Sequence, residues 1–519
     1  MLLATSENIK CVDKYAVETL GITLYELIMR AGKAVATVVK KRVALGSKIL
    51  ILVGNGNNGA DGYAAAKELL SGYRVTVYDV FGTARKNEAG RRHQHEFISL
   101  GGDVRELELN DEFYQNIDKS DCIIDAIFGT GFSGKVPEKL VGVAKAVNAQ
   151  KRAYKIAIDI PLGVNANDGS VDEDSVCAMT DTVALTFLKP GIVSYPGKTY
   201  AGKLEYDNIG LHFEDLLPVI SEKYCYVDKE CASLMVPFRE ENSNKGSFGK
   251  LLMITGSETY PGAGLLTLEA ALRGGVGFVT YLGERRIIDS FLPLFPEVIY
   301  KERPPFSDFN DATVKEILEF SCKHTVTLIG SGLGTSDALF VLLKDMLCTD
   351  SGPIIFDADA INALSSMGED GRALLRQVKR TVILTPHPLE FARLTGLSVT
   401  EVQSNRLSLA EEFARQYDCI LVLKGAGTIV TDGEKTYINS SGSSALSKAG
   451  SGDVLAGLIA SLVAWMPDPL QASALSAYVH GFAADRLKEE YGEIGVTPSD
   501  LPKEIARTLS VLNKNRQNN

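Results

Sequence analysis

The chain has 519 residues, of which 45% are hydrophobic and 23% are charged. That composition is typical of a soluble globular protein, and the length exceeds what one hydrophobic core can serve, so two large domains are expected. The net charge of −11 argues against a nucleic-acid partner. The apolar run 454–466 is shorter than the about 20 residues that a bilayer requires, so no membrane partner is expected.

The eight cysteines are scattered, and only Cys225 and Cys231 lie close together in the sequence. Without a C-x-x-C pair, this pattern favours reduced thiols over a disulfide scaffold or a zinc site. The first residues lack a basic segment followed by an apolar one, so no signal peptide is predicted. These features together predict a cytoplasmic protein.

Strands and helices alternate along the first half of the chain, which predicts a parallel, doubly wound sheet. Residues 1–42 are helix-like, and His93 and His95 lie on a basic helical stretch that we interpret as a solvated face. The strands are predicted at residues 48–53, 74–78, 122–124, 155–158 and 182–185.

The loop after the first strand reads Gly54-Asn-Gly-Asn-Asn-Gly-Ala-Asp-Gly62. Its G-x-G-x-x-G spacing, with Asp79 about 20 residues further on, formally matches a dinucleotide fingerprint and would suit a dehydrogenase. Its amide and carboxylate oxygens instead suit a cation or sugar hydroxyls, and an Asn-rich turn is the third interpretation. Asp125 and Asp159 follow later strands, so with Asp61 they are expected to converge at one sheet edge.

The second half repeats the pattern of buried strands that end in glycine or proline loops. Lys424-Gly-Ala-Gly-Thr428 offers a compact cation and free N–H donors for a diphosphate. His387 stands between two prolines, and Asp357 is at least as well explained as a helix cap. The strands are predicted at residues 250–255, 327–329, 354–356, 382–384, 419–423 and 429–431.

The stretch Lys448-Ala-Gly-Ser-Gly-Asp453 leads into the apolar run 454–466. A glycine turn before a buried helix collects unpaired N–H groups and the positive end of the helix dipole, which suits a phosphate. A carboxylate beside a phosphate makes chemical sense if Asp453 takes a proton from a hydroxyl that attacks phosphorus. The alternative is an N-cap aspartate on a buried helix.

The motifs GNGNNGADG, DAIFGTGFSG, AIDIPLGV and TFLKPG together resemble the NAD(P)H-hydrate epimerase domain, the YjeF N-terminal family, over about residues 5–215. The resemblance implies a Rossmann-like sandwich that interconverts the R and S forms of hydrated NADH and NADPH, with Asp159 at the reacting centre. It also implies potassium at Asn58, Asp125 and position 162, although Leu162 replaces the usual serine and Ala60 a usual glycine. The implied nucleotide-binding residues are Asn57, Asn58, Gly59, Ala60, Asp61, Gly129, Thr130, Gly131, Phe132, Ser133, Gly134 and Lys135.

From residue 225 to about 510 the motifs NKGSFGKLLMITGS, IGSGLGT, DADAINAL, LTPHPLEFARLTG, VLKGAGTIVTDG, LSKAGSGDVLAG and YVHGFAAD follow in order. They resemble the ribokinase-like ADP-dependent NAD(P)H-hydrate dehydratase family. Ser331 replaces its usual proline, and Leu389 its usual glycine. The resemblance implies that Asp453 is the base and that the hydrated dinucleotide is held by Ala263, Gly332, Gly334 and His387. The implied ADP-binding residues are Lys424, Gly425, Ala426, Gly427, Thr428 and Gly452.

The combined resemblance implies an α/β enzyme with a Rossmann-like domain over residues 1–220 and a ribokinase-like domain over 225–519. Its expected small-molecule substrates are the NADH and NADPH hydrates (NADHX and NADPHX), its cofactors are ADP or ATP, Mg²⁺ and K⁺, and a homo-oligomer is expected. A ribokinase-class kinase, a conventional dehydrogenase and a non-catalytic nucleotide-binding module are the alternatives.

Overall fold

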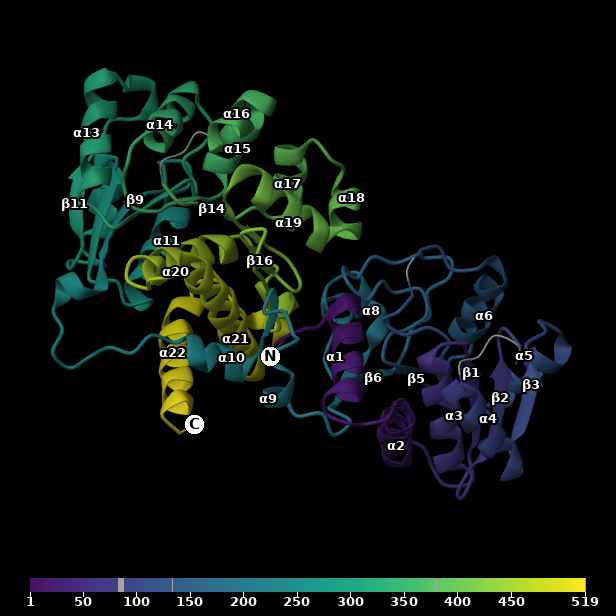
Figure 1. Ribbon diagram of the computed structural model, residues 1–519. Coiled ribbons are helices and arrows are strands. Elements are labelled where there is room, and N and C mark those ends of the chain that lie inside the picture. Colours follow the sequence, from purple (N-terminus) through teal and green to yellow (C-terminus); the bar gives the residue numbers. More distant parts are fainter. Residues whose placement is uncertain (83–87, 133, 377, 379, 519) are drawn as a thin grey trace. The chain divides into compact units, whose positions relative to one another are not determined.

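The computed structural model describes residues 1–82, 88–132, 134–376, 378 and 380–518. The chain forms two compact units (Figure 1), one of Leu2–Tyr224 and the other of Met1 with Cys225–Asn519. Each unit is built on its own mainly parallel sheet with helices on both faces, so the predicted α/β class is confirmed. Each helix in the described part of the chain is too short or too polar to cross a bilayer.

The N-terminal unit contains a seven-stranded sheet in the order β3-β2-β1-β4-β5-β6-β7, and every recorded strand pair is parallel. The central strands are almost entirely buried, as parallel strands covered on both faces must be. Each strand predicted for this half is present to within two residues. The strands are β1 (Lys48–Val53), β2 (Arg74–Asp79), β3 (Asp103–Glu106), β4 (Cys122–Ala126), β5 (Tyr154–Ile158), β6 (Asp181–Leu185) and β7 (Lys203–Asp207).

The first two helices of this unit each begin with a capping box. The side chains of Thr5 and Thr23 accept the backbone N–H three residues later, and the side chain of that later residue accepts the threonine N–H. α2 and α3 pack side by side, with Gly32 directly against Ala64 and Ala65. The helices are α1 (Ser6–Glu18), α2 (Leu24–Arg42), α3 (Asn57–Leu69), α4 (Glu88–Ser99), α5 (Asp111–Lys119), α6 (Glu138–Ala149), α7 (Pro190–Val193), α8 (Gly197–Ala201) and α9 (Phe213–Leu216).

The interpretation of His93 as part of a solvated face is wrong. Its side chain is buried on α4 and stacks on Tyr25 of α2, with ring centroids 4.4 Å apart. Tyr25 and Lys67 both bond to Glu96, so the basic appearance of this segment comes from residues that clamp α2, α3 and α4 together. His95 is exposed, as expected.

The second unit contains a ten-stranded sheet in the order β11-β10-β9-β12-β13-β14-β15-β16-β17-β8. The pairs from β11 to β15 are parallel, whereas β16 pairs antiparallel with both β15 and β17. Each predicted strand is present to within one residue. The strands are β8 (Tyr224–Val227), β9 (Lys250–Ile254), β10 (Phe278–Gly283), β11 (Ile299–Glu302), β12 (Val326–Ile329), β13 (Ile354–Phe356), β14 (Val382–Leu384), β15 (Ile420–Leu423), β16 (Ile429–Thr431) and β17 (Thr436–Asn439).

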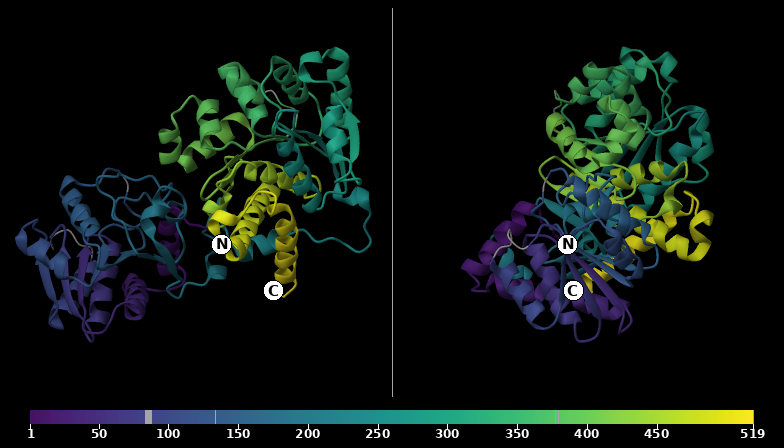
Figure 2. Two further views of the ribbon diagram at one scale, coloured as in Figure 1. Left: turned by 180° about the vertical axis from the view of Figure 1, so that it is seen from behind. Right: turned by 90° about the vertical axis from the view of Figure 1, so that its right-hand side faces the viewer.

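The helices α11, α20 and α21 pack together against one face of this sheet, whereas α13 to α16 lie on its other side (Figures 1 and 2). α20 carries the longest buried run of the unit, which is why it forms the centre of the core. The helices are α10 (Lys229–Met235), α11 (Pro261–Arg273), α12 (Arg285–Phe291), α13 (Asp311–Cys322), α14 (Asp337–Leu347), α15 (Asp359–Ser366), α16 (Gly368–Leu375), α17 (Pro388–Thr395), α18 (Val399–Ser404), α19 (Arg406–Tyr417), α20 (Ser451–Val463), α21 (Pro469–Gly495) and α22 (Leu501–Asn518).

Candidate active sites

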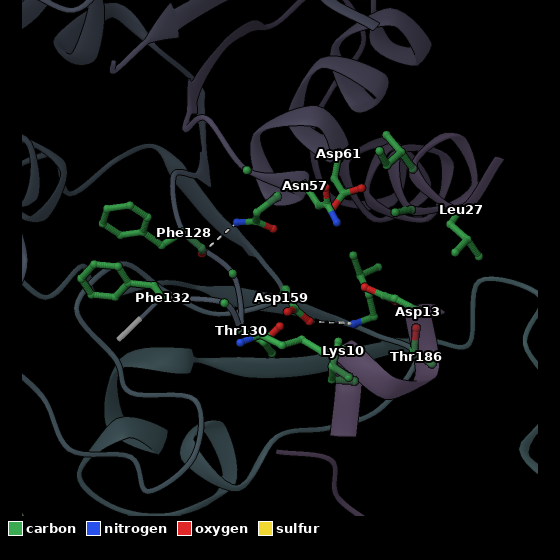
Figure 3. Close-up of a pocket in the computed structure, with 18 of the residues that line it drawn as sticks. Lys10, Asp13, Leu27, Asn57, Asp61, Phe128, Thr130, Phe132, Asp159 and Thr186 are labelled. Atoms are coloured by element: carbon green, nitrogen blue, oxygen red, sulfur yellow. Dashed lines mark hydrogen bonds between the residues drawn. The ribbon is translucent and has the colours of Figure 1, made fainter. Parts of the chain in front are cut away.

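A cavity of about 570 Å³ opens at the carboxyl edge of the N-terminal sheet. In Figure 3 Phe128 and Phe132 lie on one side of it and Leu27 on the other, with Asp61, Asp13 and Asp159 between them. The aromatic wall is itself ordered, because the rings of Phe128 and Phe132 stack with centroids 4.0 Å apart. The cavity therefore combines apolar walls with a carboxylate centre, as small-molecule sites generally do.

The glycines of the first loop bring the backbone of α3 onto the sheet. A side chain at Gly59 would meet the carbonyl oxygen of Gly54 at 2.0 Å, and one at Gly54 would meet that of Ile127 at 1.9 Å. α3 begins at Asn57, inside the stretch expected to be a loop after the first strand, so Asn57–Asp61 form its first turns. The helix therefore fixes the directions of the motif's polar side chains toward the cavity, whereas a loose turn would leave these directions variable.

Asp159 is held in an unusual position at the end of β5. Its backbone has a φ of 69°, and its carboxylate forms an ion pair with Lys189, whose side chain is 1% exposed. The Lys189 ammonium also donates to the carbonyl of Leu185 at 2.8 Å. A charged lysine buried this deeply is sustained by its anionic partner, so Asp159 and Lys189 act as a unit.

Two further carboxyl groups face the same cavity. Burial, followed by the charge of Asp159, raises the pKa of Asp61 well above its usual range. The same two causes raise the pKa of Asp13, on α1, to about 6. The cavity thus places proton-donating carboxyl groups beside a lysine-paired carboxylate, which is the arrangement that acid–base chemistry requires.

Of the residues expected to bind potassium, Asn58 lines this cavity, whereas Asp125 and Leu162 lie outside its lining. The Asn58 amide donates to the Phe128 carbonyl at 2.8 Å, while its buried Oδ1 has no hydrogen-bond partner among the described residues. Asp125 accepts the N–H groups of Ile127 and Leu162 at 3.1 and 2.7 Å, and burial raises its pKa to about 6. The Leu162 side chain is fully buried in an apolar cluster, so position 162 contributes its N–H to Asp125 and no side-chain oxygen to a cation.

Not every expected nucleotide-binding residue lines the cavity. Ala60 packs against Ile28 of α2, so its extra methyl group does not enter the cavity. Gly134 and Lys135 are exposed and outside the lining, and Ser133 lies outside the described residues. Asn57, Asn58, Asp61, Gly129, Thr130, Gly131, Phe132 and Asp159 line it, and Gly59 lies behind them against Gly54.

The second site lies where β12, β13, β14 and β15 of the C-terminal sheet end. Lys424, directly after β15, donates to Asp357 at 3.0 Å and lies 3.9 Å from Glu390. Asp357 is almost fully buried and also accepts the hydroxyl groups of Ser331 and Thr385 at 2.7 and 2.6 Å. Asp357 is therefore no helix cap, and Ser331, which replaces the family's proline, supplies one of its hydrogen bonds.

Asp453 lies in the first turn of α20, which begins after Gly450 with a φ of 102°. Burial, followed by the charge of Asp357, raises the pKa of Asp453 to about 7, and Lys424 opposes this rise. A side chain at Gly452 would meet the Lys424 ammonium at 3.3 Å. Lys424, Asp453 and the start of α20 therefore share one location, an arrangement that would suit a phosphate group and a base active near neutral pH.

His387 is the N-cap of α17 and accepts the N–H groups of Leu389 and Glu390 through Nδ1. Its Nε2 lies 3.2 Å from Glu390 Oε1, so the ring carries its proton on Nε2. Burial, then Lys424, lowers the pKa of His387. His387 is thus a neutral, oriented imidazole at the rim of the site, and its helix-capping contacts were not foreseen.

The remaining expected residues of this site also come together. Gly332 lies so close to Ala263 that an added side chain would approach its methyl group to 2.7 Å, and the N–H of Gly334 donates to Asp359. Gly425 and Ala426 are exposed beyond Lys424, Gly427 has a φ of 59°, and Thr428 folds back to donate to the Gly425 carbonyl at 3.0 Å. These two loops therefore offer mainly backbone groups to a ligand.

Several residues of these sites were missed by sequence reasoning. Lys189 sits in the quoted TFLKPG motif, yet nothing in the sequence pairs it with Asp159. Asp13 belongs to an amphipathic helix and Glu390 to a helix start, where both look ordinary. Only partners from distant parts of the chain give these residues a role in a site.

The folds and the two carboxylate-centred sites define a two-domain α/β enzyme. A family model described as NAD(P)H-hydrate dehydratase matches residues 251–507, and one described as YjeF-related protein N-terminus matches residues 24–191. The chain belongs to the family of bifunctional NAD(P)H-hydrate repair enzymes. The member from Moorella thermoacetica is 33% identical, with 96% of this chain and 95% of the relative covered.

Other relatives agree in length. Bifunctional NAD(P)H-hydrate repair enzymes from Coxiella burnetii and Escherichia coli are 32% and 31% identical, and the matches cover 96% and 97% of this chain and 98% and 93% of theirs. Among solved structures, the ADP/ATP-dependent NAD(P)H-hydrate dehydratase from Bacillus subtilis, co-crystallized with ATP/Mg²⁺, is 28% identical with a TM-score of 0.49. That match covers 55% of this chain and 98% of the solved one.

Proposed function

We propose that this protein repairs hydrated NADH and NADPH in the cytoplasm. The N-terminal unit epimerises the R and S hydrates, and the C-terminal unit dehydrates the S form at the expense of ADP, giving NAD(P)H, AMP and phosphate. The observation that carries the proposal is the juxtaposition of Asp453, with its raised pKa, and Lys424 at the start of α20. Membership of a family of bifunctional repair enzymes supports both activities.

The dehydration follows from the chemistry of the substrate. The hydrate carries a hydroxyl on its saturated nicotinamide ring, and hydroxide is a poor leaving group. Asp453 accepts the hydroxyl proton as the oxygen attacks the terminal phosphorus of ADP, and Lys424 with the N–H groups of α20 stabilises the developing charge. Phosphate then leaves with assistance from the ring nitrogen, and the iminium so formed loses a proton from the adjacent ring carbon, which regenerates the reduced dinucleotide.

The protein's own residues bind the nucleotide, whereas the metal ion binds through the nucleotide phosphates. The loop 424–428 and Gly452 hold the phosphates, and Ala263, Gly332, Gly334 and His387 hold the hydrate. Within the described residues no group of three or more His, Cys, Asp or Glu side chains could bind a metal ion by itself. Mg²⁺ is therefore expected to arrive with the nucleotide phosphates, where it would neutralise their charge.

The epimerisation needs no phosphate transfer. Opening and reclosing the ring at the hydrated carbon requires a positioned base and acid, which are Asp159 and a neighbouring carboxyl group such as Asp61. The apolar walls of Phe128 and Phe132 exclude water from the opened intermediate. Potassium, where bound, would be held by Asn58 Oδ1 and Asp125 and would keep the Asp125 carboxyl group ionised.

The proposed function is tested by incubating the protein with a mixture of R and S hydrates and ADP. We expect the near-ultraviolet absorbance of reduced nicotinamide to recover completely, because both hydrates are converted. An inactive epimerase unit would instead give an absorbance rise that stops once the S hydrate is consumed. The remaining R hydrate would then react only as fast as it interconverts spontaneously. A stable phosphorylated product without absorbance would instead show a ribokinase-class kinase, and turnover with NAD alone a conventional dehydrogenase.

The dehydration rate should fall on the acid side of neutrality. Because burial raises the pKa of Asp453 to about 7, the base is protonated below that pH, and kcat/KM should fall about tenfold for each further pH unit. Single-turnover absorbance changes at saturating ADP measure this profile. A rate that stays level across the first pH unit below about 7 would exclude Asp453 as the base.

The epimerase should depend only weakly on potassium. Leu162 supplies no side-chain oxygen, and both oxygens of Asp125 already accept backbone N–H groups, so the cation retains few protein ligands. We expect less than about a threefold rate difference between potassium and a large organic cation at equal ionic strength, below the 5–150-fold range usual for effectors that bind a second site. An absolute potassium requirement would contradict this prediction.

A further inference from the structure

Two thiols outside both sites face each other in the C-terminal unit. Cys225 lies on β8 and Cys231 in the first turn of α10, and their Sγ atoms are 3.3 Å apart. Cys225 is 7% exposed and Cys231 is half-buried, so the pair lies just below the surface. Neither thiol is needed by the proposed dehydration or epimerisation.

The turn between the two cysteines is fixed from both ends. Asp228 caps α10 by accepting the Cys231 N–H at 2.8 Å, which orients the first turn of the helix toward β8. On the other side, Ser440 donates its N–H at 3.4 Å and its hydroxyl at 2.7 Å to the Val227 carbonyl. Because the backbone on both sides is bonded, the two sulfur atoms are held facing each other.

The hydrogen bond between the two thiols makes their pKa values unequal. It lowers the pKa of Cys225, against the effect of burial, and raises that of Cys231. The thiolate is the reactive form of cysteine, so the lowered pKa favours Cys225 as the nucleophile, and Cys231, whose Sγ lies 3.3 Å away, is positioned as the resolving thiol. This division of roles distinguishes the pair from Cys11, Cys322 and Cys348, which are exposed.

We propose that Cys225 and Cys231 form a peroxide-sensitive dithiol that closes reversibly to a disulfide. The Cys225 thiolate attacks one oxygen of hydrogen peroxide, the O–O bond breaks, and a sulfenic acid and water form. Cys231 then attacks the Cys225 sulfur, the S–O bond breaks, and a second water leaves. In total two thiols and one peroxide give one disulfide and two waters. A small oxidant fits the limited exposure of Cys225.

The experiment treats the full-length protein with hydrogen peroxide, blocks remaining thiols with iodoacetamide and digests with trypsin. Lys229 lies between the cysteines, so cleavage separates 224–229 from 230–239 and only a disulfide keeps these peptides together. We expect the linked pair, two hydrogens lighter than the sum of the free peptides, to form at least about tenfold faster than oxidation of Cys348. Dithiothreitol should release it.

Two variants test the roles of the individual cysteines. In Cys231→Ser the Cys225 sulfenic acid should persist and be trapped by dimedone, whereas Cys348→Ser should leave the linkage unchanged. Full alkylation of both cysteines after peroxide treatment would overturn the proposal. So would oxidation of Cys225 to the sulfinic acid without linkage, or a disulfide that joins two chains.

Discussion

Asp453→Asn is expected to lower dehydration of the hydrate by about 10²–10⁴-fold, the usual contribution of a positioned general base. Asparagine keeps the shape of the side chain but cannot accept the hydroxyl proton. The carboxylate that repels a phosphate also disappears, so ADP should bind at least as tightly as in the wild type. Absorbance recovery measures the first effect, and calorimetric titration with ADP measures the second.

The same variant should also change how the stability of the protein depends on pH. Because folding raises the pKa of Asp453 from 3.8 to about 7, the folded protein holds a proton that the unfolded chain releases between these values. Wild-type stability should therefore decline as pH rises through this window, and the variant should lack that decline. We expect Asp453→Asn to melt higher than the wild type above pH 7, with the difference disappearing near pH 4.

Asp350→Asn is the matched control, because Asp350 is exposed in the same unit. It should preserve turnover, ADP affinity and the pH dependence of melting. Near-normal dehydration by Asp453→Asn would remove Asp453 from the mechanism. Weaker ADP binding in that variant would show that the carboxylate holds the nucleotide, and no longer that it acts as the base.

Asp159→Asn is expected to abolish epimerisation while the dehydration of the S hydrate continues. The substitution keeps a residue type that tolerates the φ of 69°, so the turn after β5 is preserved. It removes the charge that sustains Lys189, whose side chain is 1% exposed. Breaking a buried ion pair costs about 3–5 kcal/mol, so the N-terminal unit should also melt earlier.

These two effects separate when the R and S hydrates are assayed apart at a temperature below the new melting transition. The S hydrate should give the wild-type rate, and the R hydrate should react only as fast as it interconverts spontaneously. The exposed Asp174 on the same unit provides the control Asp174→Asn. Full activity on the R hydrate would assign the acid–base role to Asp61 or Asp13 instead.

A second substitution tests whether the unpaired Lys189 ammonium causes the loss of stability in Asp159→Asn. A double variant that replaces Lys189 by methionine removes the uncompensated ammonium and should recover much of the lost melting temperature. Its epimerase activity should remain absent, because the carboxylate is still missing. Recovery of activity in the double variant would show that Asp159 only neutralises Lys189.

Much of this protein follows from local sequence. The buried strands 48–53, 354–356 and 382–384 are strongly hydrophobic, and each has a glycine or proline within two residues of one of its ends, so their positions follow from local sequence. The alternation with helices then predicts parallel sheets, and the carboxyl edges of such sheets are where ligands bind. Asp159 was identified as a candidate on this basis, whereas Lys424 was identified from its glycine loop and Asp453 from the glycine turn before a buried helix.

Contacts between distant segments decided what local sequence could not. The sequence leaves Asp357 as an ordinary helix cap, and only folding brings Ser331, Thr385 and Lys424 onto its carboxylate. His93 appears to belong to a polar face until Tyr25, from another helix, covers its ring. Charge, burial and partner are properties of the assembled fold, because each depends on side chains that the chain brings together from far apart. The sequence alone therefore determined the elements and the candidate residues, whereas the tertiary structure decided which carboxyl groups are paired and which take up a proton near neutral pH.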